Sequence, residues 1–365
     1  MKKINNKLPS GNYNIFIGKN ILSKLTKEIE HLNLHKNVLF IIDRNVNKYY
    51  YKYIFDNIKA KFNKSDSIII NSNELEKRIA SAEKIYSQLI QKKYGRDTLL
   101  IAIGGGIVGD IAGFVAATYM RGIQYVQIPT TLLAAVDSSV GGKTGVNFGD
   151  AKNIVGCFYQ PKLVLIDTHF FKTLNQSEII CGMGEVVKYA FLSDVNFYNY
   201  LNLNLNKILK LEPNVIEKVI YESIKFKCSV VMQDEREDGL RKILNLGHTF
   251  AHALEIAQKY KIKHGQAVIV GIVCSLFLSN RIGYINKENL NLYLKFLNIF
   301  KSKIKLKNLS TDEMYKIMLK DKKNRNGKIK FVLPIEIGKI FIDAECSVSL
   351  IIDSISESIK FFVNK

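Results

Sequence analysis

One glutamate and three histidines in the second half of the chain have side chains that suit a catalytic metal ion. Glu185 comes first, and His248 and His252 follow at a spacing of one helical turn. His264 lies a little further along the chain. One carboxylate with two imidazoles is a set that binds zinc and leaves a coordination position open. We therefore predict a metal site formed by Glu185, His248 and either His252 or His264, because spacing alone does not choose between the last two.

A glycine-rich turn follows the apolar run that starts at Leu99. Gly104, Gly106 and Gly109 match the GxGxxG spacing with which a strand-turn-helix unit holds a pyrophosphate at a helix N-terminus. The match by itself is weak, and no acid about 20 residues further on occupies the strand end where a ribose is usually bound. The motif indicates phosphate binding and argues against a standard Rossmann dehydrogenase.

A second polar, glycine-rich stretch runs from Asp137 to Asn147, and Lys152 and Asn153 follow it. It contains Gly-Gly-Lys-Thr, which resembles the end of a P-loop, but Asp137 stands where that motif needs its first glycine. Small polar residues and lysines beside apolar strands suit the binding of oxyanions. We predict an anion-binding loop here, and not a P-loop.

The elements that must position these residues differ between the two halves of the chain. Short runs rich in Ile, Val and Leu predict buried strands in the first half, at residues 38–42, 68–70, 99–103, 125–128 and 163–166. Helix-like segments such as residues 74–92 separate them. This alternation predicts a parallel sheet covered on both faces, with ligands at the carboxyl ends of its strands.

Helical periodicity dominates the second half of the chain. It predicts helices over residues 177–192, 214–232, 247–260 and 265–281. Ser310-Thr-Asp-Glu313 has capping-box spacing and predicts a helix start near residue 311, and residues 328–333 predict a small strand. We expect an α/β fold with a Rossmann-like parallel-sheet domain (residues 1–172), a mainly α-helical domain (residues 173–365) and a cleft between them.

The composition limits the kind of protein. Lys and Arg number 53 against 33 Asp and Glu, which gives a formal charge of +20, but the lysines are spread along amphipathic segments. This favours solvated lysine faces over a nucleic-acid site. Residues 99–120 carry a single charge, Asp110, but their glycines favour a strand, a turn and a buried helix over a membrane span. Five cysteines without a CxxC pair, and a start without a long apolar stretch, predict a cytoplasmic protein.

These motifs together resemble the 3-dehydroquinate synthase family, from Leu99 to about residue 334. The matching segments are Gly104–Asp110, Arg121-Gly122, Ile128–Thr131, Val136–Thr144, Lys152-Asn153, Phe158–Pro161, Gly184–Lys188, Asp234-Glu235, Leu244–Thr249, His264-Gly265 and Asp321–Lys323. One departure lies upstream, where Asn73 precedes Glu74 in place of the family's usual glycine. The resemblance implies a dehydroquinate synthase-like fold, NAD and one divalent metal ion, zinc or cobalt, as cofactors, and a homodimer.

The resemblance also implies roles for individual residues. The implied metal ligands are Glu185, His248 and His264. The implied NAD site consists of Glu74, Lys77, Gly105, Gly106, Ile107, Val108, Gly109, Asp110, Thr130, Thr131, Asp137, Lys143, Lys152, Phe170, Phe171, Lys172 and Thr173. The implied substrate site consists of Arg121, Asp137, Lys143, Asn153, Lys188, Lys227, Arg241, Asn245, His252 and Lys323. The implied catalytic set is Lys152, Asn153, Glu185, Lys188, Arg241, Asn245 and His252.

The implied activity is that of a lyase of the shikimate pathway, which serves aromatic amino acid biosynthesis. It converts an anionic sugar phosphate, 3-deoxy-D-arabino-heptulosonate 7-phosphate, to 3-dehydroquinate and phosphate, through transient oxidation by NAD, phosphate elimination, reduction and intramolecular aldol closure. A related cyclase making valiolone or inosose is the close alternative, and Arg241 and Asn245 favour dehydroquinate over it. A metal-dependent polyol dehydrogenase, which would release NADH, and a nucleic-acid-binding protein are more distant alternatives.

Overall fold

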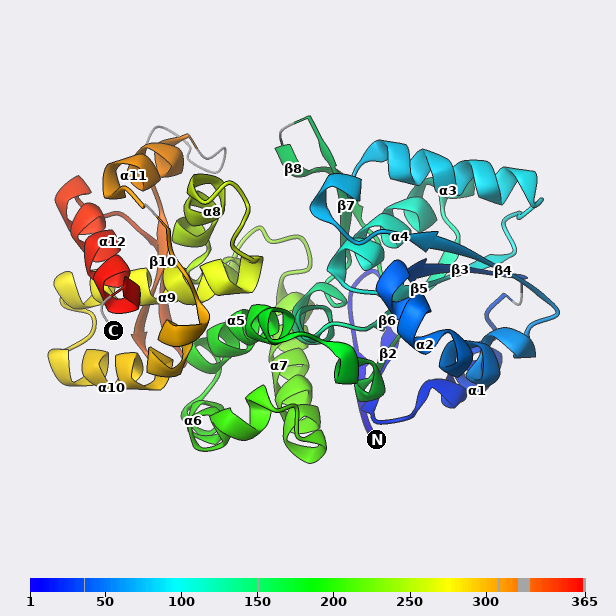
Figure 1. The fold of residues 1–365 in the computed structure, drawn as a ribbon, viewed down its shortest axis with the longest axis horizontal. Helices are drawn as coiled ribbons and strands as arrows, with labels where there is room; N and C mark the ends of the chain where they lie inside the picture. The colour runs from blue at the N-terminus through cyan, green and yellow to red at the C-terminus, as the bar shows by residue number, and fades with distance from the viewer. Residues whose placement is uncertain (36, 150, 308, 321–328, 364–365) are drawn as a thin grey trace. The chain divides into compact units, whose positions relative to one another are not determined.

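The computed structural model describes residues 1–35, 37–149, 151–307, 309–320 and 329–363, which form two compact units (Figure 1). The first unit contains Met1–Leu174 and Pro213–Arg236, and the second contains Asn175–Glu212 and Glu237–Lys365. Helix α7 (Pro213–Gln233) therefore groups with the first unit although it lies in the helical half of the sequence.

A seven-stranded sheet forms the centre of the first unit, in the order β1-β2-β9-β6-β5-β3-β4. Its strands are β1 (Lys2–Asn6), β2 (Tyr13–Gly18), β3 (Asn37–Asp43), β4 (Lys64–Ile70), β5 (Thr98–Gly104), β6 (Gln124–Pro129) and β9 (Leu163–Asp167). All neighbouring pairs are parallel except β1 and β2. β3 pairs with β4 on one side and with β5 on the other, so the chain changes direction across the sheet at β3. Parallel sheets bind ligands at the carboxyl ends of the strands beside such a switch point.

Helices cover the sheet of the first unit because its strands are apolar on both faces. α3 (Ile79–Gln91) and α4 (Gly106–Thr118) share one core with alternate residues of β3 and β5, including Leu39 and Ile41. α1 (Leu25–His31) and α2 (Arg44–Asn57) lie on the other side of these strands from α3 (Figure 1). A separate hairpin of β7 (Lys143–Phe148) and β8 (Ala151–Phe158) follows β6 and contacts α4.

The second unit is mainly helical. Its helices are α5 (Gln176–Leu192), α6 (Val195–Leu209), α8 (His248–Ala257), α9 (His264–Arg281), α10 (Lys287–Leu297), α11 (Thr311–Leu319) and α12 (Val348–Val363). The antiparallel strands β10 (Phe331–Glu336) and β11 (Lys339–Ala344) complete it. α9 contacts α5, α8, α10, α12 and β10, so it is the central element of this unit (Figure 1).

The expected elements correspond closely to those observed. All five predicted strands of the first half form, as β3, β4, β5, β6 and β9. The predicted capping box is present, because the Ser310 side chain accepts a hydrogen bond from the Glu313 N–H at the start of α11. Among the described residues, no helix is both long and apolar enough to cross a bilayer.

Candidate functional site

Glu185, His248 and His264 converge within the second unit, from α5, the start of α8 and the start of α9. Their candidate ligand atoms all lie within 4.8 Å of one another. Nε2 of His248 and Nε2 of His264 each lie 3.5 Å from Oε1 of Glu185. The structure thus brings His264, and not His252, into the group with Glu185 and His248.

These separations fit a bound cation better than direct hydrogen bonds. A distance of 3.5 Å is at the outer limit for a hydrogen bond between nitrogen and oxygen. Metal–ligand bonds of about 2.0–2.2 Å at a tetrahedral angle separate ligand atoms by about 3.3–3.6 Å. The donor set of two imidazoles and one carboxylate, and its spacing, therefore fit a divalent cation of the zinc or cobalt type.

Glycines beside the three side chains let their helices approach closely. Gly265 follows His264, and a Cβ at this position would lie 1.7 Å from the carbonyl oxygen of Cys181 on α5. Gly247 precedes His248, and a Cβ on Gly271 of α9 would lie 2.1 Å from the Gly247 carbonyl oxygen. Both contacts are shorter than real Cβ atoms make, so these glycines permit the helix crossings that bring the three side chains together.

The charges and the burial around this cluster shift the pKa values of the two imidazoles in opposite directions. Burial lowers the pKa of His248 well below its usual value, and the positive charge of Lys188 adds to the effect. Burial also opposes a charge on His264, but the carboxylates of Glu185 and Glu255 raise the pKa of His264 to about 10. His248 is therefore neutral and ready to bind a cation, whereas a cation must displace a proton from His264.

Four predicted substrate residues also belong to the second unit. Lys188 is 2% exposed and forms an ion pair with Oε2 of Glu185. Arg241 is 2% exposed in the 3-10 helix Leu240–Asn245. Asn245 ends that helix, and the His252 ring centroid lies 5.7 Å from that of His248. These positions place cationic and amide side chains in the same unit as the candidate metal ligands.

Sequence reasoning did not identify Glu237, which contacts the predicted substrate residue Asn245. Glu237 accepts a hydrogen bond from Nδ2 of Asn245, with 2.8 Å between the two atoms. The bond fixes the orientation of the Asn245 amide, because its nitrogen must face the carboxylate. The acidic segment Asp234-Glu-Arg-Glu237, of which only the first two residues were used in the motif, was the available signal.

In the first unit, the predicted glycine motif lies at the carboxyl end of β5. Gly105 is extended and Gly106 begins α4, so amides at the start of this helix point out from the strand end. A Cβ on Gly106 would lie 2.9 Å from Oγ of Ser138. Thr130 and Thr131 follow the neighbouring strand β6. This edge of the sheet combines free helix amides with small polar residues, as a pyrophosphate requires.

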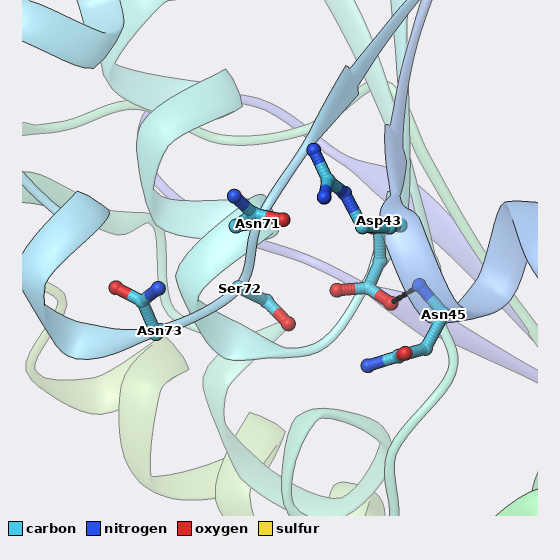
Figure 2. Close-up of a pocket in the computed structure, with 6 residues that line it drawn as sticks. Asp43, Asn45, Asn71, Ser72 and Asn73 are labelled. Atoms are coloured by element: carbon cyan, nitrogen blue, oxygen red, sulfur yellow. Dashed lines mark hydrogen bonds between the residues drawn. The ribbon is translucent and has the colours of Figure 1, made fainter.

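A pocket of about 220 Å³ lies at the carboxyl ends of β3 and β4, and β3 pairs with β5, the strand that leads into the glycine motif. Figure 2 shows the residues that line it. Its lining residues are Asp43, Arg44, Asn45, Asn71, Ser72 and Asn73. Oδ1 of Asp43 caps α2 by accepting hydrogen bonds from the N–H groups of Asn45 and Val46. Oδ2 of Asp43 is buried and has no hydrogen-bond partner among the described residues. A hydroxyl of a ligand bound in the pocket would satisfy this oxygen.

The sequence did not reveal this acid because it precedes the glycine motif. The rule of an acid about 20 residues downstream assumes that the next strand of the chain lies beside the glycine strand. Here β5 lies between β6, the next strand of the chain, and β3, which comes earlier, and the acid stands at the end of β3 instead of β6. Asn73, which replaces the family's glycine, has a φ of −106° and caps the 3-10 helix Glu74–Glu76, so this turn requires no glycine.

Two predicted NAD residues and one predicted substrate residue form a polar contact in the first unit. The Nζ of Lys77 donates hydrogen bonds to Oδ2 of Asp110 and to Oδ1 of Asn153. Lys77 is 6% exposed, and burial raises the pKa of Asp110 while the Lys77 charge opposes that rise. Glu74 contacts the hairpin through Oε1, which accepts from Nδ2 of Asn147 at 2.8 Å.

Lys227 explains why α7 groups with the first unit. Its Nζ lies 2.6 Å from Oδ1 of Asp137 and 2.7 Å from the Asp137 carbonyl oxygen. Asp137 belongs to a π-helical turn, Ala134–Ser138, that α7 contacts. Three further predicted residues of this unit are Arg121 and Lys143, which are exposed, and Lys152, which is half-buried on β8.

The segment Phe170–Thr173 lies directly after β9, in the 3-10 helix Thr168–Thr173. Phe170 and Phe171 are buried, and the Tyr50 hydroxyl from α2 contacts the Phe170 carbonyl oxygen at 3.2 Å. Predicted NAD residues thus follow four strands of one parallel edge: β9, β6, β5 and β4. Lys323 lies outside the described residues.

Comparison with known proteins identifies the family of the chain. Residues 67–181 match the family model of the 3-dehydroquinate synthase N-terminal domain, and residues 182–324 match that of its C-terminal domain. The chain is 40% identical to the 3-dehydroquinate synthase of Alkaliphilus metalliredigens over 92% of this chain and 93% of the relative. It is 43% identical to that of Pelagibacter ubique, over 90% and 91%.

A solved structure extends the likeness to the whole fold. A 2-deoxy-scyllo-inosose synthase complexed with carbaglucose-6-phosphate, NAD+ and Co2+ superposes with a TM-score of 0.90 at 25% identity, covering 98% of this chain and 100% of the other. The fold is therefore the two-domain α/β fold that the sequence predicted. The chain belongs to the 3-dehydroquinate synthase family.

Proposed function

We propose that this protein is a 3-dehydroquinate synthase, which converts 3-deoxy-D-arabino-heptulosonate 7-phosphate to 3-dehydroquinate and phosphate in the shikimate pathway. The observation that carries the proposal is the convergence of Glu185, His248 and His264 in a chain of this family. About 40% identity to relatives of this name, over nearly the whole chain, supports the same activity.

The first unit has the features that NAD requires. The amides at the start of α4 suit the pyrophosphate, and the pocket beside them holds the unpartnered Oδ2 of Asp43. A carboxylate at this strand end suits the hydroxyls of a ribose. We therefore add Asp43 to the predicted NAD site, together with the adjacent Asn45.

The second unit has the features that a divalent cation requires, and Glu185, His248 and His264 are its proposed ligands. Bound NAD would supply a reversible hydride acceptor, used catalytically and regenerated in each turnover, and the cation would supply a Lewis acid. We propose zinc or cobalt because the ligands are one carboxylate and two imidazoles.

The positively charged side chains of the proposed site suit a substrate that carries a phosphate and a carboxylate. The planar guanidinium of Arg241 matches a carboxylate or a phosphate, and Asn245, oriented by Glu237, can donate or accept a hydrogen bond. Two lysines of the proposed site form ion pairs with acids, Lys188 with Glu185 and Lys227 with Asp137. His252 has an imidazole that can accept or donate a proton.

A related cyclase that makes another cyclic product is the alternative supported by a specific observation. The 2-deoxy-scyllo-inosose synthase structure shares the whole fold, so the fold does not separate the two activities. Relatives at 40% and 43% identity carry the dehydroquinate synthase name, against 25% identity for this cyclase. A measurement of which substrate the protein converts therefore decides between the two activities.

The test is phosphate release from 3-deoxy-D-arabino-heptulosonate 7-phosphate with trace NAD, with and without a chelator. We expect many molecules of phosphate for each NAD, a loss of activity with the chelator, and restoration by zinc or cobalt. Release from glucose 6-phosphate instead would favour an inosose-type cyclase, and NADH accumulating with product would indicate a dehydrogenase.

Three further properties belong to this proposal. The enzyme would be a lyase, since phosphate leaves by elimination. The five cysteines are all free, which supports a reducing compartment such as the cytoplasm. The homodimer stays a prediction, which light scattering after size-exclusion chromatography would measure directly.

A further inference from the structure

A second carboxylate lies beside the candidate metal ligands. Glu255 is on α8 and is 7% exposed. Its Oε2 lies 3.4 Å from Nδ1 of His264. The contact is long for a hydrogen bond, but it places a nitrogen that can donate within reach of a buried carboxylate, and buried carboxylates are generally satisfied by donors.

Both candidate imidazoles are arranged in the same way. Nδ1 of His248 lies 3.2 Å from the Leu246 carbonyl oxygen, as Nδ1 of His264 faces Glu255. On the opposite side of each ring, Nε2 lies 3.5 Å from Oε1 of Glu185. Each ring therefore has an acceptor at Nδ1 and the proposed metal position at Nε2.

This arrangement decides which ring nitrogen carries the hydrogen. A neutral imidazole has one N–H, and an acceptor at Nδ1 keeps the hydrogen there and leaves the lone pair on Nε2. For His248 the acceptor is a backbone carbonyl, which no substitution removes. For His264 it is the Glu255 side chain. Glu255 faces the side of the ring away from Nε2, so it does not belong to the ligand group itself.

We propose that Glu255 is a positioning residue that holds the Nδ1 hydrogen of His264 and thereby directs the Nε2 lone pair to the cation. The inference rests on the proposed metal site. Partners of this kind typically contribute 10- to 100-fold to metal affinity.

Three variants distinguish the hydrogen bond from Glu255 to His264 from the electrostatic effect of the Glu255 charge. Glu255→Ala removes the acceptor and the charge, whereas Glu255→Gln removes the charge and keeps an amide oxygen that can accept from Nδ1. Glu178→Gln is the matched control, because Glu178 pairs with Lys263, next to His264, without contacting the imidazole. Cobalt affinity is measured by optical titration against a competing chelator, and circular dichroism of the metal-free proteins checks the fold.

We expect Glu255→Ala to weaken cobalt binding about 10- to 100-fold, Glu255→Gln to recover most of that loss, and Glu178→Gln to change affinity less than about threefold. Equal losses in the two Glu255 variants would mean that charge alone matters and would overturn the proposal. Wild-type affinity in Glu255→Ala would overturn it as well.

Proton NMR of the cobalt-loaded wild type adds a measurement that needs no variant. We expect two exchangeable, cobalt-shifted N–H signals, one from each ligand imidazole, and faster solvent exchange of the His264 signal in Glu255→Ala. A His264 ring that shows no Nδ1–H signal would contradict the inference. If the wild type bound no cobalt at all, the proposed metal site would fail instead, so the two failures are distinguishable.

Discussion

Glu185 is the residue on which the proposed metal site depends, because its Oε1 faces both imidazoles while Lys188 pairs with its Oε2. The sequence could predict the residue types of this site, since one acid and several histidines in a helical region suggest a metal. Spacing could not choose between His252 and His264, whereas the family resemblance implied His264. His252 shares a helix face with His248, but His264 reaches the group from a different helix.

Residues whose partners come from distant segments could not be identified from spacing. Asp43 lies at a strand end that precedes the glycine motif, and Glu255 approaches His264 across the contact between α8 and α9. Their roles follow from which strands and helices are neighbours, which periodicity does not encode.

His248→Ala should remove the bound metal. The loss of one imidazole from three protein ligands leaves too few donors, so we expect metal content to fall from about one ion per chain to near zero. Turnover should fall more than about 1,000-fold, because a Lewis acid contributes several kcal/mol to the transition state. Metal analysis and phosphate release measure both effects. His31→Ala, at an exposed histidine, is the control, and an active, metal-free His248→Ala protein would disprove the assignment.

Asp43→Asn should weaken NAD binding while α2 stays capped. A hydrogen bond to a charged group contributes about 1.5–3 kcal/mol, so we expect the apparent NAD affinity to fall about 10- to 100-fold. Asn caps helices as well as Asp does, so the melting temperature should change little. Asp43→Ala removes both roles and should also cost about 1 kcal/mol of stability. Unchanged NAD affinity in both variants would exclude Asp43 from the NAD site.

At the scale of elements, apolarity explains most of the strands that the sequence could predict. β2 is an exception, because it is almost entirely buried and was not predicted. β3, β5, β6 and β9 are almost entirely buried, so each forms a short apolar run. β1 alternates exposed and half-buried residues, and β8 has no buried residue, so neither gives that signal. Their polar composition is typical of strands at an edge or in an isolated hairpin.

Glycines where helices cross closely set the spacing of the proposed metal ligands. The Gly271→Ala substitution tests this at the crossing of α8 and α9. The new Cβ would lie 2.1 Å from the Gly247 carbonyl oxygen, so α8 and α9 must separate. Overpacking of this kind costs about 1–3 kcal/mol, and the displaced His248 should bind the cation more weakly. Thermal unfolding and cobalt titration measure the two effects.

Gly95→Ala is the control for this substitution, because its Cβ would approach only the end of the Asp97 side chain, at 3.0 Å. A Gly271→Ala protein with the stability and cobalt affinity of the control would show that the crossing does not set the ligand positions.

At the scale of the whole molecule, the proposed cofactor sites belong to different compact units. The features that suit NAD lie in the first unit, and the candidate metal ligands lie in the second. The sequence predicted an α/β unit followed by a helical one, but α7 joins the first unit because Lys227 and its neighbours contact Asp137 and the turn around it. The grouping of α7 with the first unit depends on tertiary contacts, and local sequence patterns do not reveal these.

Hydrogen exchange should therefore respond to each cofactor in a different unit. A ligand at 100 times its dissociation constant stabilises the bound state by about 2.7 kcal/mol, which slows exchange through local opening about 100-fold. We expect NAD to protect the amides near Asp43 and Gly105, and zinc to protect those near Glu185, His248 and His264. Mass spectrometry of peptides measures this. Protection by zinc confined to the first unit would contradict the assignment.

The most direct test of the metal centre is anomalous diffraction from crystals grown with cobalt, recorded on both sides of the cobalt absorption edge. We predict one strong anomalous peak per chain, bounded by the Glu185 carboxylate and by Nε2 of His248 and of His264. A peak elsewhere, or none at this position in crystals of active enzyme, would contradict the central claim that these three side chains hold the catalytic cation.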